Sequence, residues 1–135
     1  MRLKQPEALS TGIRMPGTNS VLQDHFLHPR NNQLIQSTNA VGFADMGGSP
    51  PKIIVALNIS DNTLLEASFS AMGCGYLIAC GSACTELVKG RDLGFAERLD
   101  ANEIEAFLGG LPVHRKYCAE LAVSALKDAV SRRQS

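Results

Sequence analysis

Residues 52–70 read KIIVALNISDNTLLEASFS, and this stretch decides the fold class. Its first half is rich in β-branched side chains, which favour a strand. Asp61 and Asn62 then give a turn signal, and a second apolar run returns from Leu64 to Ser70. Two such runs separated by a short turn predict a β-hairpin.

A third strand is predicted immediately before this hairpin. The segment from Ser37 to Ala44 alternates apolar and polar side chains, and the glycine- and proline-rich residues 45–51 interrupt it. No helix-length segment separates the three runs, and connections this short favour antiparallel pairing over a parallel sheet. We therefore expect a three-stranded antiparallel meander over residues 37–70.

Helices are predicted before and after these strands in the sequence. Residues 75–88, GYLIACGSACTELV, carry small and apolar side chains on nearly every face, which is typical of a buried helix. Asp100 and Glu103 match a capping box for a helix over residues 101–108. The other predicted helices run over residues 20–28 and 116–132. The expected fold class is α+β, with the helices at 75–88 and 116–132 packed against one face of the sheet.

Length and composition indicate a single domain. The chain has 135 residues, with 13 Lys and Arg against 13 Asp and Glu. This balance gives no reason to expect nucleic acid or an anionic membrane as a partner, and no run reaches the roughly 20 apolar residues of a membrane span. We predict a flexible tail over residues 1–18 and a domain over 19–135. The N-terminus lacks the apolar region of a secretory signal, so we expect a cytoplasmic protein with reduced thiols.

The four cysteines fall into two predicted classes. Cys74 lies between the third strand and the buried helix, and Cys118 lies in the first turn of the last helix. Unpaired N–H groups and the helix dipole at such positions favour a thiolate, which is a better nucleophile and ligand. Cys80 and Cys84 are four residues apart on one helix face and are interpreted as core residues, since a metal clip there would need two further ligands. Burial is the plain alternative for Cys74 and Cys118 as well.

Several segments, taken in order, resemble one protein family. They are Asp24 to Asn31 (DHFLHPRN), Met72 to Gly75 (MGCG), Thr85 to Gly90 (TELVKG), and Leu108 to Ala122, which holds a Leu-Gly-Gly-Leu-Pro loop before Cys118. From Val21 to about Arg132 the chain resembles the U-type iron–sulfur cluster assembly scaffolds of the IscU/NifU N-terminal type. The resemblance implies an α+β fold with a site at one end, where three loops meet. It also implies a scaffold protein rather than an enzyme.

The resemblance further implies a cargo, a set of partners and the residues that serve them. An iron–sulfur cluster or zinc would be bound through Cys74 and Cys118. A cysteine desulfurase would dock near Leu111, Pro112 and Arg115, with recipient apo-proteins as later partners. We also hypothesise that Cys118 accepts persulfide sulfur from the desulfurase.

The departures from the family pattern lie in the site itself. Met46 stands where the family has a ligand Cys, Gly48 where it has Asp, and Tyr117 where it has His; Arg115 replaces the family's Lys. Zinc or a cluster iron takes four donors, so the two thiolates of one chain cannot close such a site. Three solutions stay open: Asp45 or His114 as substitute ligands, or a homodimer in which two chains supply four thiolates.

Three functions follow from this altered site. The chain is a working scaffold with changed ligands, a module that docks on a desulfurase or another assembly factor without binding a cluster, or a sulfur acceptor that needs no metal. A structural protein with two buried thiols is the fourth and plainest hypothesis.

Overall fold

The computed structural model describes residues 20–133. The elements are, in order, α2 (Ser20–Leu27), β1 (Ala40–Met46), β2 (Ser49–Ser60), β3 (Thr63–Met72), α3 (Gly75–Val88), α4 (Leu93–Arg98), α5 (Ala101–Leu108), the 3-10 turn η1 (Val113–Arg115) and α6 (Tyr117–Ser131). None of the helices in the described part is long and apolar enough to cross a membrane. The predicted tail over residues 1–18 lies outside the described residues.

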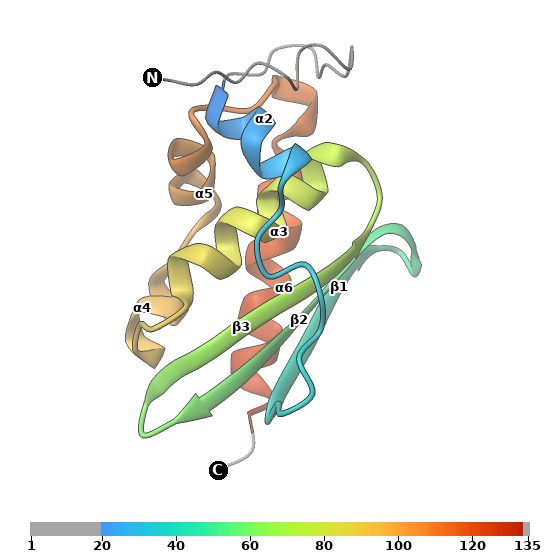
Figure 1. Cartoon of the computed structure of the whole chain (residues 1–135). Helices are drawn as coiled ribbons and strands as arrows, with labels where there is room; N and C mark the ends of the chain where they lie inside the picture. The colour runs from blue at the N-terminus through green and yellow to red at the C-terminus, as the bar shows by residue number, and fades with distance from the viewer. Residues whose placement is uncertain (1–19, 134–135) are drawn as a thin grey trace, which may run out of the picture.

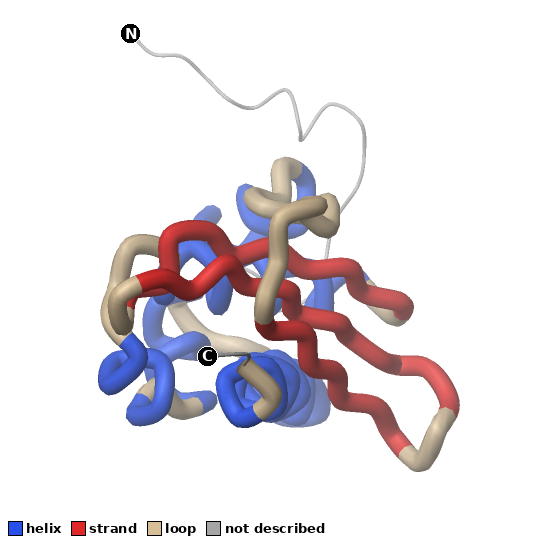
Figure 2. The backbone as a smooth tube through the Cα atoms, turned by 90° about the horizontal axis from the view of Figure 1, so that it is seen from below, coloured by secondary structure: helices blue, strands red, loops and turns tan. Residues whose placement is uncertain are grey.

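The sheet is a meander with strand order β1-β2-β3 and antiparallel pairing throughout. Phe43 pairs with Ile54, and Val55 pairs with Phe69, so β2 is the central strand. Both α3 and α6 pack on this sheet, and Figure 2 shows α6 nearly end-on along one face of it. The predicted α+β fold with a three-stranded antiparallel sheet is confirmed.

The connection between the first two strands differs from the prediction. Residues 45–51 were expected to break the sheet, but β1 continues to Met46 and β2 starts at Ser49. Gly47 and Gly48 alone make the turn, both in the left-handed region with φ of 72° and 87°. Glycine adopts this conformation at no steric cost, so two residues suffice. Pro50 and Pro51 belong to β2 but lie outside its paired positions, where a missing N–H costs no ladder hydrogen bond.

The predicted helices are present, and one was missed. α3 occupies the predicted range, the capping box of Asp100 and Glu103 is formed, and α6 begins within a residue of the expected start. The additional helix α4 begins after Asp92, whose side chain accepts a hydrogen bond from the Phe95 N–H. At six residues it is too short to show an apolar period, and its capping aspartate was the only signal.

The centre of the molecule is α3, which contacts β3, α2, α5 and α6 (Figure 1). Ten of its fourteen residues are buried, as its small and apolar composition predicts. Gly81 lets the Phe69 ring of β3 approach closely, since a Cβ atom there would lie 2.5 Å from that ring. Because α3 is held on all sides, its N-terminus is a fixed position at one end of the sheet.

The first helix is fastened to α3 by a buried polar network. His25 Nδ1 lies 2.7 Å from the Ser82 hydroxyl, which also accepts the Arg30 backbone N–H at 2.8 Å. Burial lowers the pKa of His25, with the nearby Arg30 charge as a second cause. Arg30 itself pairs with Asp24 at 2.7 Å. These residues of the Asp24 to Asn31 motif are therefore occupied in holding α2 in place.

We expect the Asp128 side chain to stabilise the edge strand β1. The Phe43 N–H donates to Asp128 Oδ2 at 3.0 Å, and this hydrogen bond lowers the pKa of the carboxyl. A lowered pKa in the folded state adds stability above the ordinary pKa and loses it as pH falls through the folded value. Asp128→Ala should therefore cost about 1 kcal/mol at neutral pH, and the difference from wild type should shrink in acid. Urea denaturation at several pH values measures it, with Ser124→Ala on the exposed face of α6 as control. A penalty that is constant down to acid pH would contradict the role of the charge.

Candidate functional site

Cys74 is fixed at the junction of β3 and α3. It is the N-cap residue of α3, and its carbonyl accepts the N–H groups of Leu77 and Ile78 at 3.1 and 3.3 Å. The glycine on each side permits close packing: a Cβ atom on Gly75 would lie 2.2 Å from the Phe26 ring. The side chain of Cys74 is half-buried, so its sulfur remains partly accessible.

Cys118 lies beside Cys74 although the two are far apart in the sequence. It sits in the first turn of α6 and is fully buried, and its thiol lies close enough to that of Cys74 for the two side chains to interact. The start of α6 is held by an ion pair between Lys116 and Glu105 of α5. The structure thus brings the two predicted site cysteines together.

Cys80 and Cys84 are core residues, as predicted. Both are fully buried, and Cys84 Sγ lies 3.9 Å from the Ala122 carbonyl oxygen of α6. Burial raises the pKa of Cys84 to about 12 and that of Cys80 well above its ordinary value. Neither thiol is available to solvent.

The ionisation predicted for Cys118 is wrong. Burial, with the neighbouring Cys74 as a second cause, raises the pKa of this thiol to about 12. Hydrogen bonding by Tyr117 and the charge of Arg115 act in the opposite direction but do not compensate. The helix N-terminus was expected to favour the thiolate, but its effect is at most a few kcal/mol, whereas burial of a charged group costs more.

Arg115 points its guanidinium at the cysteine pair. Its Nη1 atom lies 3.9 Å from Cys74 Sγ and donates to the Tyr117 hydroxyl at 3.2 Å. The guanidinium carbon lies 5.4 Å from the centre of the Tyr76 ring, a cation–π distance. The Nε–H is shielded from solvent and has no hydrogen-bond partner within the described part of the chain. The pair of thiols therefore faces a fixed positive charge, which no sequence pattern indicated.

The three residues predicted for partner docking are placed differently from one another. Leu111 is buried in the core, Pro112 is half-buried, and Arg115 is engaged with Cys74 and Tyr117. The exposed apolar residue of this loop is Val113, with 82% of its surface accessible. Sequence analysis missed Val113 because exposure of one residue in a tight turn leaves no period to detect.

Comparison with known proteins identifies the family. The sequence model of the NifU-like N terminal domain matches residues 18–135. The chain belongs to this family. This confirms the resemblance to U-type scaffolds seen in the order of the sequence motifs.

Curated relatives carry scaffold and nitrogen-fixation names. The chain is 42% identical over 108 residues to "Nitrogen fixation protein NifU" of Cereibacter sphaeroides, covering 80% of this chain and 44% of that protein. It is 32% identical over 114 residues to "Iron-sulfur cluster assembly scaffold protein IscU" of Aquifex aeolicus, covering 83% and 73%. The chain thus spans less than half of that NifU protein and about three quarters of that IscU protein.

Solved structures of the family share the fold. A scaffold protein for the SUF system from Fervidobacterium islandicum AW-1 superimposes with a TM-score of 0.66 at 15% identity, covering 83% of this chain and 95% of that chain. The N-terminal part of a NifU-like protein from Brucella abortus gives 0.67 at 13% identity, covering 84% and 92%. At these identities the likeness concerns the fold alone.

The NifU-like site of this chain lacks donors at the expected positions. Met46 ends β1 with 53% of its surface exposed, and Gly48 is a turn residue without a side chain. His114 is exposed in η1. Asp45 accepts a hydrogen bond from the Gly48 N–H at 3.0 Å, so its carboxylate closes the turn. In the described residues no group of three or more His, Cys, Asp or Glu gathers as a metal site, so neither Asp45 nor His114 completes one with the thiols.

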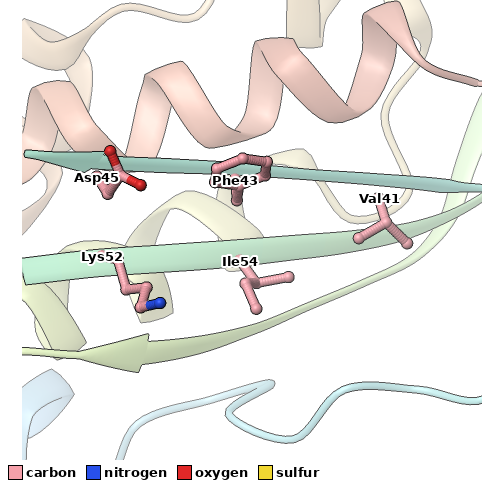
Figure 3. Close-up of a pocket in the computed structure, with 5 residues that line it drawn as sticks. All are labelled: Val41, Phe43, Asp45, Lys52 and Ile54. Carbon is pink, nitrogen blue, oxygen red and sulfur yellow. The ribbon is translucent and has the colours of Figure 1, made fainter. Parts of the chain in front are cut away.

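Asp45 also faces a different surface from the cysteines. It lines a shallow pocket of about 270 Å³ with Val41, Phe43, Lys52 and Ile54, on the face of β1 and β2 opposite to the one that Gly42 presents to α6 (Figure 3). Figure 3 shows these five side chains along two neighbouring strands, mostly apolar with one charge of each sign at one end. This pocket therefore does not belong to the cysteine site.

The four thiols should differ in reactivity according to exposure. Only Cys74 is partly accessible, so iodoacetamide should alkylate it first, Cys118 much more slowly, and Cys80 and Cys84 only on unfolding. We expect a rate difference of at least about 100-fold between Cys74 and Cys84, because reaction of a buried thiol requires local opening of the fold. Timed alkylation followed by peptide mass spectrometry measures these rates. Fast labelling of Cys80 in the folded protein would contradict the assignment.

Proposed function

We propose that this chain works in iron–sulfur cluster assembly as a scaffold-type protein that receives sulfur from a cysteine desulfurase at its cysteine pair. The observation that carries the proposal is the contact between Cys74 and Cys118 at one end of a NifU-like domain. The chain then acts as a carrier and assembly platform rather than as an enzyme, and recipient apo-proteins take the product.

The number of donor groups limits which metal ions or clusters one chain can bind alone. Two thiols are present, a third donor is missing from the described residues, and the Arg115 guanidinium lies against one of the thiols. A fixed positive charge beside a ligand opposes the binding of Zn²⁺ or iron, and such ions take four donors. We propose that iron, zinc or a 2Fe–2S cluster is held only when a second copy of the chain or a partner protein supplies the missing donors.

A docking module without any cargo is the second candidate. It is favoured by the exposed apolar side chains around this end of the domain: Val113 before the start of α6, Met46 at the end of β1 and Met72 at the end of β3. Exposed methionines are adaptable contact residues for a protein partner. In this case the cysteine pair is a remnant and the surface carries the function.

Anaerobic reconstitution separates the two candidates. The protein is incubated with a cysteine desulfurase, cysteine and ferrous iron, and bound iron, acid-labile sulfide and native mass are measured. The scaffold-type function predicts iron and sulfide on the chain, with about one 2Fe–2S cluster for two chains and loss of both in Cys74→Ser. A change in desulfurase turnover without sulfur or iron on the chain would instead support the docking module. Cys84→Ser is the matched control, because this thiol lies in the core.

A further inference from the structure

The four cysteines differ in which of them an outside sulfur donor can reach. Cys80, Cys84 and Cys118 are fully buried, and Cys74 is half-buried at the N-terminus of α3. A donor persulfide on another molecule must bring its outer sulfur to within bonding distance of the acceptor. Cys118 has no exposed surface, so the residues that cover it would first have to move. Access therefore favours Cys74 over Cys118.

The polar groups around Cys74 are suited to an anion. Arg115 Nη1 lies 3.9 Å from its sulfur, which leaves room for a shorter contact, and the same nitrogen donates to the Tyr117 hydroxyl. The Arg115 Nε–H is shielded from solvent and lacks an acceptor among the described residues. A buried donor without a partner is costly, so an acceptor that reaches this guanidinium on the sulfur side would be stabilised. The Tyr76 ring beneath the guanidinium keeps it in this orientation.

We propose that Cys74 is the residue that accepts sulfur, and that Arg115, oriented by Tyr117, holds the persulfide anion formed there without a metal ion. This inference rests on the proposed function, since it names the acceptor and its binding group at the same site. An S–S bond of about 2.05 Å extends the side chain of Cys74 by one sulfur atom, which then serves as the acceptor for the guanidinium N–H groups.

The transfer step is balanced in atoms and electrons. The Cys74 thiolate attacks the outer sulfur of a donor persulfide R–S–SH, and its own proton passes to solvent. A new S–S bond forms to Cys74 while the S–S bond within the donor breaks, and the electron pair of that bond leaves on R–S⁻. One outer sulfur moves from donor to acceptor, so no external oxidant or reductant is needed. The outer sulfur on Cys74 then loses its proton to give the anion that Arg115 binds.

The choice of arginine matters for this role. A guanidinium offers several N–H donors in one plane and can therefore contact the Tyr117 hydroxyl and a sulfur anion at once. A lysine at position 115 would supply a single point charge on a flexible chain. The structure thus assigns to Arg115 a function of its own and not only the conservation of charge.

The acceptor is tested with a small alkyl persulfide in the presence of a metal chelator. Mass spectrometry of the alkylated peptides locates the added sulfur atom. The expected result is sulfur on Cys74 in the wild type and in Cys118→Ser, and loss of modification in Cys74→Ser. Sulfur that appears on Cys118 while Cys74 stays unmodified would overturn the assignment. A requirement for zinc or iron would overturn the metal-free binding of the anion.

The role of Arg115 is tested by the rate of this transfer and by the lifetime of the product. Arg115→Ala should slow the transfer or shorten the lifetime of the Cys74 persulfide about tenfold or more, since hydrogen bonds to charged groups are the stronger ones. Arg115→Lys should recover part of the effect, and Tyr117→Phe should reduce it less than Arg115→Ala does. The matched control is Arg91→Ala, because Arg91 also lies over an aromatic ring, that of Phe95 at 4.2 Å, but near the other end of β3. Equal rates and lifetimes in wild type and Arg115→Ala, at equal thermal stability, would overturn the role of Arg115.

A second arm replaces the alkyl persulfide with a cysteine desulfurase and cysteine. Sulfur on Cys74 from both donors supports the inference and the proposed function together. Sulfur from the alkyl persulfide but not from any desulfurase tested leaves the acceptor site intact and refutes the proposed partner. Sulfur from the desulfurase that is found only on Cys118 refutes the inference and leaves the proposed function standing.

Discussion

Gly42→Val should abolish the packing of α6 on the sheet and destabilise the protein by about 4 kcal/mol or more. A Cβ atom at position 42 would lie 2.1 Å from the Ala129 backbone nitrogen and 2.7 Å from the Ala125 carbonyl oxygen. Both are backbone atoms of a helix, so no side-chain rotation relieves the clash, and α6 as a whole must move. Such a loss is a large part of the 5–15 kcal/mol that stabilises a typical domain. Because Cys118 belongs to α6, the cysteine pair should separate as well.

Chemical denaturation and cysteine alkylation measure the two consequences of this change. We expect a lower urea midpoint and faster labelling of Cys118 than in the wild type. Gly94→Ala is the matched glycine control: its Cβ would meet the flexible end of Arg98 at 3.0 Å and make an ordinary contact with Asp92 Oδ1 at 3.5 Å, and alanine favours the helix α4. That variant should be as stable as the wild type or slightly more so. A urea midpoint of Gly42→Val equal to that of the wild type would contradict the close packing of α6 on β1.

The parts of the fold that follow from local chemistry were predictable from the sequence. The capping box of Asp100 and Glu103 needs only residues three apart, and α3 is recognisable because its side chains are small and apolar on nearly every face. The prediction of a long break over residues 45–51 was wrong because Pro50 and Pro51 were interpreted as strand breakers. Their tolerance depends on which positions of β2 are paired, and that depends on β1 and β3.

The candidate site, like the fold, was predictable from the sequence only in part. The meeting of Cys74 and Cys118 followed from the order of the family motifs, since neither cysteine has a recognisable partner spacing. The raised pKa of Cys118 could not be predicted from the sequence. The position of this residue in a helix is local information, whereas its burial depends on the packing of α3 against α6. The contact between Arg115 and Cys74 joins a 3-10 turn to a helix N-terminus from another part of the chain. Such a contact becomes visible only when both segments are placed.

Met46, Tyr117 and Arg115 then have a common interpretation. The first two remove a thiol and an imidazole from the family's ligand set, and the third presents a cation to one of the remaining thiols. Loss of donors alone would leave a weak metal site. Arg115 keeps the positive charge of the family's Lys but spreads it over a planar guanidinium in contact with Cys74, so the anion site that we propose depends on the lost donors and this contact together.

Met46→Cys combined with Tyr117→His should raise zinc occupancy from well below one ion per chain to about one. The double change adds a thiolate and an imidazole to the two existing thiols, which gives the four-donor set that closes a tetrahedral zinc site. It also removes the phenol hydroxyl that Arg115 contacts at 3.2 Å, so the guanidinium loses one of its fixed partners beside Cys74. Met46 is exposed at the end of β1 and Tyr117 is only half-buried, so neither change opens a cavity in the core. Each added donor of the right type should strengthen zinc binding by about tenfold or more, and bound zinc should raise the midpoint of thermal unfolding.

Metal analysis after gel filtration and competition with a chromophoric chelator measure the occupancy and affinity of this double variant. Met46→Ser with Tyr117→Phe is the matched control, because it makes changes at the same two positions and adds neither a thiolate nor an imidazole. The single variants Met46→Cys and Tyr117→His should fall between the control and the double variant, since three donors leave one zinc position open. One tightly held ion per wild-type chain would contradict the donor count and require a ligand outside the two thiols. Failure of the double variant to bind zinc, in a folded protein, would mean that position 46 or 117 does not face the cysteine pair.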